Sequence, residues 1–103
     1  MKRNEIVEKL EEIRPKLEKE GFVIEALTGS FAKDEATPQS DVDLLYHLEA
    51  SFVRRYGGFR AFKKLEEIRD TLHEALGRPV DLIASNNLSK TAERFMERFE
   101  LKR

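Results

Sequence analysis

Cysteine is absent from the 103 residues, and so is any long apolar run. Without thiols the chain can form neither a disulfide framework nor a cysteine-ligated zinc site, and a reducing setting is the simplest expectation. No stretch approaches the ~18 apolar residues that a membrane span needs, and the charged N-terminus has no signal-peptide core. These absences predict a soluble, cytoplasmic protein that does not contact a membrane.

An excess of charge of either sign is also missing. The chain has 19 Lys and Arg against 20 Asp and Glu, and its net charge is −1. A general nucleic-acid binder would be more basic, so no direct nucleic-acid binding is expected. The length suits a single domain over residues 1–103 with one modest core.

Helical periodicity is clearest in two stretches. Residues 4–20 carry one apolar face and residues 59–76 a longer one, formed by Phe59, Phe62, Leu65, Ile68, Leu72 and Leu76. Both faces are predicted to pack in the core. Asn4 is expected to cap the first helix, Gly21 to end it, and Pro15 to kink or split it.

The remaining segments are less regular. Residues 49–58 are predicted to be a flexible connection with at most a helical turn. A last helix is expected over residues 88–99, with its cap among Ser85, Asn86, Asn87 and Ser89, and the tail from Leu101 is expected to fray. Buried strands are predicted over residues 22–27, 41–48 and 79–84.

The stretch from Leu27 to Leu45 contains the candidate site. Asp41 and Asp43 are two residues apart, so in a strand they share a face and lie roughly 7 Å apart along the chain. Two carboxylates this close repel each other unless a divalent cation such as Mg²⁺ lies between them. The alternative is that the two aspartates only form the polar end of a strand.

A topology follows if these aspartates act together with Gly29 and Asp81. Gly29 ends the first strand and Asp41 begins the second, so these strands must be antiparallel neighbours. Asp81 begins the third strand, which must run parallel to the second, and the helix over residues 59–76 supplies the crossover. The prediction is an α/β fold of the α+β type, with a mixed three-stranded sheet in the order 1-2-3 and about four helices.

The residues in these positions also form a family pattern. The runs G-S-F-A at 29–32, S-D-V-D-L-L at 40–45 and V-D-L-I at 80–83 resemble the nucleotidyltransferase superfamily that includes DNA polymerase β, and most of all its minimal nucleotidyltransferases. The resemblance covers the middle two thirds of the chain in the family's order. It implies the nucleotidyltransferase fold and transfer of a nucleoside monophosphate, with release of pyrophosphate.

The resemblance also implies a role for each matching residue. Gly29 and Ser30 would hold the nucleotide's phosphates, and Lys33 and Ser40 belong to the same nucleotide-binding set. The carboxylates of Asp41, Asp43 and Asp81 would ligate Mg²⁺, as two ions, and Asp81 would also act as base toward the acceptor hydroxyl. ATP would be the substrate that supplies AMP.

Partner and activity follow from the same resemblance. Minimal nucleotidyltransferases of this kind act as antitoxins of HEPN-domain RNase toxins, by AMP transfer to a tyrosine or by binding alone. The chain is too short to carry its own acceptor domain, so a partner chain or a second copy in a homo-oligomer must supply one. Lys33 and Asp34 stand where the family usually has Arg-Gly, which keeps open the alternative of a catalytically weak or inactive antitoxin that only binds.

Other candidates carry less weight. Neither His47 nor His73 has a partner at metal-ligand spacing, so both are interpreted as structural. Arg54 and Arg55 are interpreted as solvent- or partner-facing ahead of a role in triphosphate contact. A phospho-acceptor role for Asp41 or Asp43 would need the five-fold βα repeat of a receiver domain, which the chain does not show.

Overall fold

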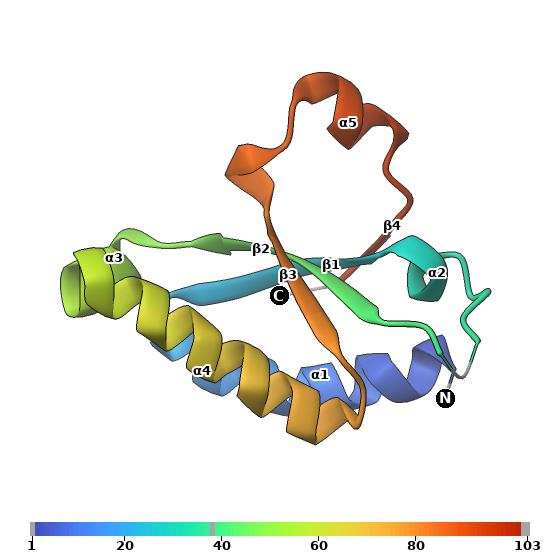
Figure 1. Ribbon diagram of the computed structural model, residues 1–103, viewed down its shortest axis with the longest axis horizontal. Coiled ribbons are helices and arrows are strands. Elements are labelled where there is room, and N and C mark those ends of the chain that lie inside the picture. Colours follow the sequence, from blue (N-terminus) through green and yellow to red (C-terminus); the bar gives the residue numbers. More distant parts are fainter. Residues whose placement is uncertain (1, 38, 102–103) are drawn as a thin grey trace.

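The computed structural model describes residues 2–37 and 39–101, with only the backbone of residues 87, 93 and 95 (Figure 1). The elements are, in chain order, α1 (Arg3–Lys19), β1 (Phe22–Thr28), α2 (Gly29–Ala32), β2 (Val42–Leu48), α3 (Ala50–Tyr56), α4 (Gly58–Leu76), β3 (Val80–Ala84), the 3₁₀ turn η1 (Ser85–Asn87), α5 (Lys90–Phe95) and β4 (Arg98–Glu100). None of the helices in the described residues is long and apolar enough to cross a membrane.

The four strands form one mixed sheet in the order β3-β2-β1-β4. β1 is antiparallel to β2 and to β4, whereas β2 and β3 are parallel. The α3–α4 segment supplies the long crossover that a parallel pair requires. The predicted order and directions of the first three strands are therefore confirmed, and β4 is an addition that the sequence pattern did not indicate.

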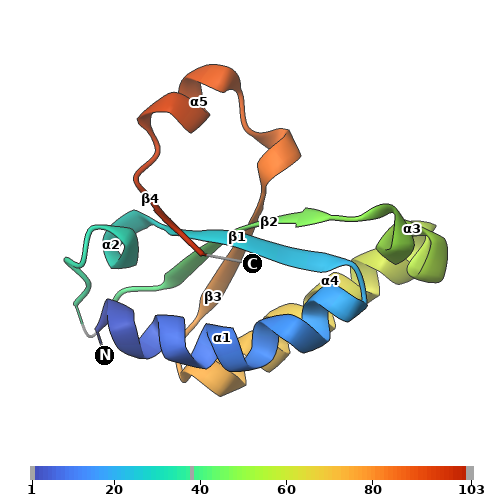
Figure 2. The same ribbon diagram turned by 180° about the vertical axis from the view of Figure 1, so that it is seen from behind.

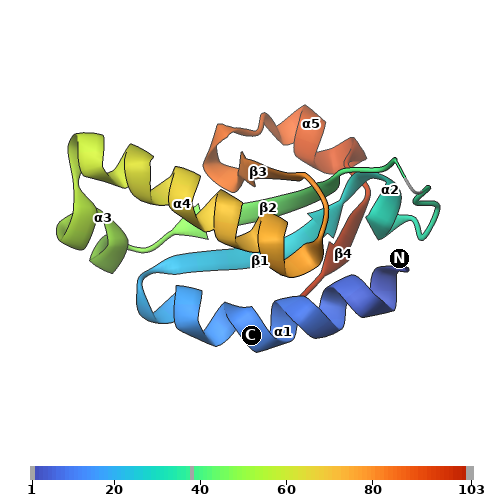
Figure 3. The ribbon, with the colours of Figure 1, turned by 60° about the horizontal axis from the view of Figure 1, so that its bottom comes forward.

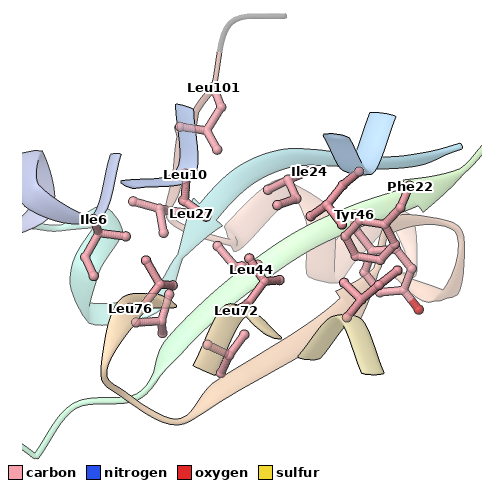
Figure 4. Close-up of a cluster of buried hydrophobic side chains, with 14 of the residues drawn as sticks. Ile6, Leu10, Phe22, Ile24, Leu27, Leu44, Tyr46, Leu72, Leu76 and Leu101 are labelled. Carbon is pink, nitrogen blue, oxygen red and sulfur yellow. The ribbon is translucent and has the colours of Figure 1, made fainter. Parts of the chain in front are cut away.

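Helices α1 and α4 cover one face of this sheet (Figures 1 to 3). Their buried side chains meet the inward side chains of β1 and β2 in a single apolar cluster (Figure 4), which includes Ile6, Leu10, Phe22, Ile24, Leu27, Leu44, Tyr46, Leu72 and Leu76. Within it the rings of Phe22 and Tyr46 stack with centroids 4.8 Å apart. Within the described residues the opposite face carries no long helix, and the segment that contains η1 and α5 spans it (Figures 1 and 2).

The start of α1 differs from the prediction. Lys2, not Asn4, is the N-cap, and Asn4 lies inside the helix. Pro15 does not split the helix, which continues from Arg3 to Lys19. A proline removes one backbone donor, but burial of Leu10 and Leu17 on either side of it holds both halves of the helix on the sheet.

Two predictions for the α3–α4 region are wrong. The connection over residues 49–58 is largely helical, because α3 buries Phe52 and packs its ring 4.9 Å from that of Tyr56. Phe59 and Phe62 are not in the core, since 80% and 61% of their surfaces are exposed. The first turns of α4 lie beside α3 at the end of the molecule, and only its later turns reach the sheet (Figure 3).

The C-terminal segment also departs from the prediction. Only residues 90–95 are α-helical, with the Ser89 hydroxyl accepting a hydrogen bond from the Ala92 N–H at 3.0 Å. Phe99 lies in β4, with the Arg3 guanidinium 4.4 Å from its ring centre. Leu101 does not fray: it is buried, and its N–H donates to the Glu25 carbonyl at 2.9 Å. Residues 102 and 103 lie outside the described residues.

Candidate nucleotide-binding site

Two carboxylates meet at one end of the sheet. Asp43 and Asp81 are register partners across the parallel pair β2–β3, and Asp41 precedes β2. Burial raises the pKa of Asp43, and the charges of Asp81 and Asp41 together with a hydrogen bond to Asp81 raise it further. The three aspartates are thus electrostatically coupled, and a cation between them would relieve their repulsion.

Gly29 lies directly against Asp43. Its neighbour Thr28 is the register partner of Asp43 across β1–β2, so the chain turns into α2 beside the carboxylate. The φ angle of Gly29 is +69°, and a Cβ atom placed on it would lie 2.6 Å from Oδ2 of Asp43. Both the backbone conformation and the space therefore require glycine here.

A cavity of about 420 Å³ opens in front of these residues. It is lined by Thr28, Gly29, Lys33, Asp43, Ile83, Ala92, Met96 and Glu97. The structure thus brings together three residues predicted for the site, Gly29, Lys33 and Asp43. The wall formed by Ala92, Met96 and Glu97 was missed, because helical spacing placed these residues in the apolar pattern of a last helix over residues 88–99 and indicated no cavity. Thr28 could have been predicted as a lining residue, since it directly precedes Gly29 in the sequence.

The segment 85–97 between β3 and β4 supplies that wall, and it arches over the open face of the sheet (Figures 1 and 2). Glu25 lies at the irregularity in the β1–β2 register and contacts residues at both ends of this segment, which is called the arch below. Its carboxylate accepts a hydrogen bond from the Ser85 hydroxyl and lies 3.7 Å from the Arg98 guanidinium. Burial alone would raise the pKa of Glu25, but the Ser85 and His47 hydrogen bonds and the His47 and Arg98 charges lower it.

The loop that leads into Asp41 is held from the side by Arg78. Its guanidinium donates to the carbonyls of Thr37 and Ser40 at 3.3 and 3.1 Å. It also lies 5.5 Å from the ring centre of Phe31 in α2. Arg78 stands just before β3, so it connects the strand that carries Asp81 to the loop that presents Asp41.

Four of the seven predicted site residues do not line this cavity: Ser30, Ser40, Asp41 and Asp81. The Ser40 hydroxyl accepts the Thr37 N–H at 2.8 Å, and Ser40 lines a separate cavity of about 630 Å³ with Arg78. The Ser30 carbonyl accepts the Glu35 N–H at 2.9 Å. Neither is among the described residues that line the cavity beside Asp43.

The conformation of Asp34 bears on the unusual Lys33-Asp34 pair. Its φ angle is +58°, the left-handed region that glycine favours and aspartate tolerates better than most residues. The family's usual glycine thus corresponds to a real backbone requirement. Asp34 is exposed and is not among the described residues that line the cavity, whereas Lys33 is.

A divalent cation such as Mg²⁺ needs several oxygen ligands from protein, water or substrate. Among the described residues, no three His, Cys, Asp or Glu side chains are gathered closely enough to enclose a metal ion. The Asp43–Asp81 pair nevertheless fits a hard cation, because both donors are carboxylate oxygens and the Asp43 charge is disfavoured without one. Mg²⁺ commonly takes one or two carboxylates and completes its ligands with water and substrate phosphate.

A mixed sheet that pairs two acidic strand ends in parallel beside a glycine turn is the arrangement of the nucleotidyltransferase fold. The sequence matches the nucleotidyltransferase domain family over residues 3–103, so the chain belongs to that family. Its fold is similar to that of a solved structure described as a "putative minimal nucleotidyltransferase". The TM-score is 0.73 at 24% sequence identity, over 98% of this chain and 97% of the other. No curated protein matches the chain at comparable stringency.

Proposed function

We propose that this nucleotidyltransferase uses Mg²⁺ and ATP to transfer AMP to a hydroxyl of a protein partner. The observation that carries the proposal is that Asp43, the register partner of Asp81, lies against Gly29 and lines a cavity together with Gly29 and Lys33. Carboxylates opposite a phosphate-binding turn are the requirement of nucleotidyl transfer. Lys33 supplies a positive charge where a triphosphate would lie.

Each residue has a defined task in this reaction. The α2 turn at Gly29 and the Lys33 ammonium group hold the phosphates, and the Asp43–Asp81 pair, with Asp41 next to it, would hold Mg²⁺, which neutralises phosphate charge when bound. The acceptor oxygen attacks the α-phosphorus and gives its proton to Asp81. A phosphorus–oxygen bond to the acceptor forms as the bond to the bridging α–β oxygen breaks, and pyrophosphate leaves.

The resemblance noted from the sequence points to a HEPN-domain toxin as the acceptor, with a tyrosine as the modified residue and the chain as its antitoxin. The test is incubation of that purified partner with labelled ATP and Mg²⁺. Wild type should transfer label, Asp41→Asn plus Asp43→Asn should not, and the exposed pair Glu8→Gln plus Glu12→Gln should match wild type. Equal labelling by all three proteins would refute the proposal.

A second candidate function is neutralisation of the partner by binding alone. It is favoured by the Lys33-Asp34 departure and by the lack of a three-ligand metal group among the described residues. The two functions differ in nucleotide binding. A ligand present at 100 times its Kd stabilises a protein by about 2.7 kcal/mol, so ATP with Mg²⁺ should raise the Tm of an enzyme clearly and that of a purely binding antitoxin not at all.

A further inference from the structure

The largest exposed apolar side chains of the described residues lie on the α3–α4 hairpin. They are Phe59, Phe62 and Val53, with 80%, 61% and 56% of their surfaces exposed. Phe59 and Phe62 are three residues apart on α4 and therefore share one side of the helix. A soluble domain rarely exposes two neighbouring phenylalanines without a partner for them.

The same hairpin concentrates positive charge. Residues 50–65 contain no Asp or Glu and five cations: Arg54, Arg55, Arg60, Lys63 and Lys64. Because the whole chain has a net charge of −1, the rest of it is net negative by six. The positive charge is therefore confined to the hairpin, and its sign is opposite to the net charge of the rest of the chain.

Most of these cations are available to a partner. Lys64 is engaged, since its ammonium lies 3.4 Å from Glu20 and 5.3 Å from the Tyr56 ring centre. In the described part of the chain, Arg54, Arg55, Arg60 and Lys63 form no ion pair. A pocket of about 210 Å³ on the same hairpin is lined by Tyr56, Arg60, Lys63, Lys64 and Glu67.

We infer that the α3–α4 hairpin is a docking surface for an acidic protein partner, which places apolar side chains on Phe59 and Phe62 and carboxylates beside Arg60 and Lys63. Aromatic residues and arginine are the types enriched at protein interfaces. The surface lies at the opposite end of the sheet from α2 and Gly29 (Figures 1 and 2). The partner is thus held at a site separate from the cavity.

Charge argues against two other occupants. A symmetric contact between two copies would oppose two hairpins of like charge. A nucleic acid along α4 would meet Glu66, Glu67 and Asp70, which follow the phenylalanines on the exposed side of the helix. An acidic protein surface can end before those residues.

This inference rests on the proposed function only in that the enzyme acts on a protein, and it is tested by binding without nucleotide. The probe is a fluorescent 20-residue amphipathic peptide with leucine on one face and glutamate elsewhere, and the matched control peptide carries lysine in place of glutamate. Wild type should bind the acidic peptide, and the affinity should fall as salt rises. Phe59→Ser plus Phe62→Ser and, separately, Arg60→Ser plus Lys63→Ser should each weaken binding at least tenfold.

The controls separate this surface from general stickiness and from the cavity. Lys16→Ser, an exposed cation on α1, and Asp43→Asn should bind as wild type does. The substituted side chains on the hairpin and on α1 are exposed, so the variants at these positions should keep the wild-type Tm. The inference would be overturned if the acidic peptide did not bind, or if the lysine peptide bound equally well. It would also be overturned if a twenty-nucleotide single-stranded RNA bound through the phenylalanines, or if wild type formed a dimer that Phe59→Ser plus Phe62→Ser abolished. AMP transfer that fails while the peptide binds would refute only the proposed function.

Discussion

Gly29 and Asp43 are so close that a Cβ atom on Gly29 would lie 2.6 Å from Oδ2 of Asp43. The contact joins the turn that leaves β1 to the carboxylate on β2, and it leaves room for a backbone but not for a side chain. The position therefore links the fold to the proposed chemistry.

Gly29→Ala should displace the Asp43 carboxylate and strain the backbone at φ +69°. A non-glycine residue in this region costs about 1–2 kcal/mol, to which the contact adds. Gly77→Ala is the matched control, because Gly77 has the same φ of +69° but nothing within 4 Å of its added Cβ. Chemical denaturation should show the larger loss for Gly29→Ala, and only this variant should lose nucleotidyl transfer. Equal losses of stability would show that the contact is relieved without cost.

Asp43→Asn should stabilise the protein at neutral pH while it abolishes transfer. Burial and the charges of Asp81 and Asp41 raise the Asp43 pKa above its usual 3.8, so folding disfavours the ionised form. The penalty appears as pH rises through 3.8 and is complete above the raised pKa. Without Mg²⁺, the gain should be less than about 1 kcal/mol, or at most roughly 4–8 °C in Tm. It should vanish below pH 3.8.

The exposed substitution Glu8→Gln is the control for this pH series and should leave the Tm profile of wild type unchanged. Added Mg²⁺ should reduce the difference between wild type and Asp43→Asn, because the cation stabilises only the carboxylate. A lower Tm of Asp43→Asn at pH 7 would contradict the electrostatic account.

Arg78→Gln should loosen the loop that presents Asp41, since its guanidinium bonds the Thr37 and Ser40 carbonyls. We expect a loss of about 1 kcal/mol in stability and about tenfold or more in kcat/KM, because small displacements of catalytic groups are costly. Arg78→Lys keeps the charge but not the fork, and it should restore only part of the activity. Full activity of both variants would rule out a positioning role.

Leu101→Ala tests whether the end of the chain is part of the fold. Leu101 is buried, and its N–H extends the pairing beside β4. Loss of the side chain should cost about 2 kcal/mol, measured by urea unfolding, whereas the exposed control Lys90→Ala should cost nothing measurable. A fraying tail would make the two variants indistinguishable.

Secondary structure and burial were predictable from the sequence where an apolar pattern lies in a single surrounding, such as the core against the sheet. The strands and the later turns of α4 were predictable, since Ile68, Leu72 and Leu76 are buried against the sheet. Phe59 and Phe62 continue the same period, yet the helix extends past the sheet there. Periodicity shows which side of a helix is apolar and not whether another element covers it.

The prediction of one helix over the C-terminal segment was wrong for a related reason. Phe99 follows Phe95 by four residues, which mimics a helical face, but three residues of β4 suffice to pair with β1. The pairing of Asp43 with Asp81 was predictable because strand pairing is a strict geometric constraint, and the two residues are register partners. Their role as metal ligands stays a prediction. The wall at Ala92 and Met96 depends on where the arch folds back, which no local pattern specifies.

Two sides of the cavity differ in rigidity. One side is the sheet, which has a full apolar core beneath it, and the other is the arch of residues 85–97, a short segment whose two ends are held by contacts with Glu25. Amide hydrogens of the arch should therefore exchange with solvent earlier than those of β1 and β2. Substitutions in the arch can change the size of the molecule that the cavity accepts, while the geometry of the aspartates on the sheet stays the same. Substrate selectivity can therefore change independently of the catalytic chemistry in one small domain.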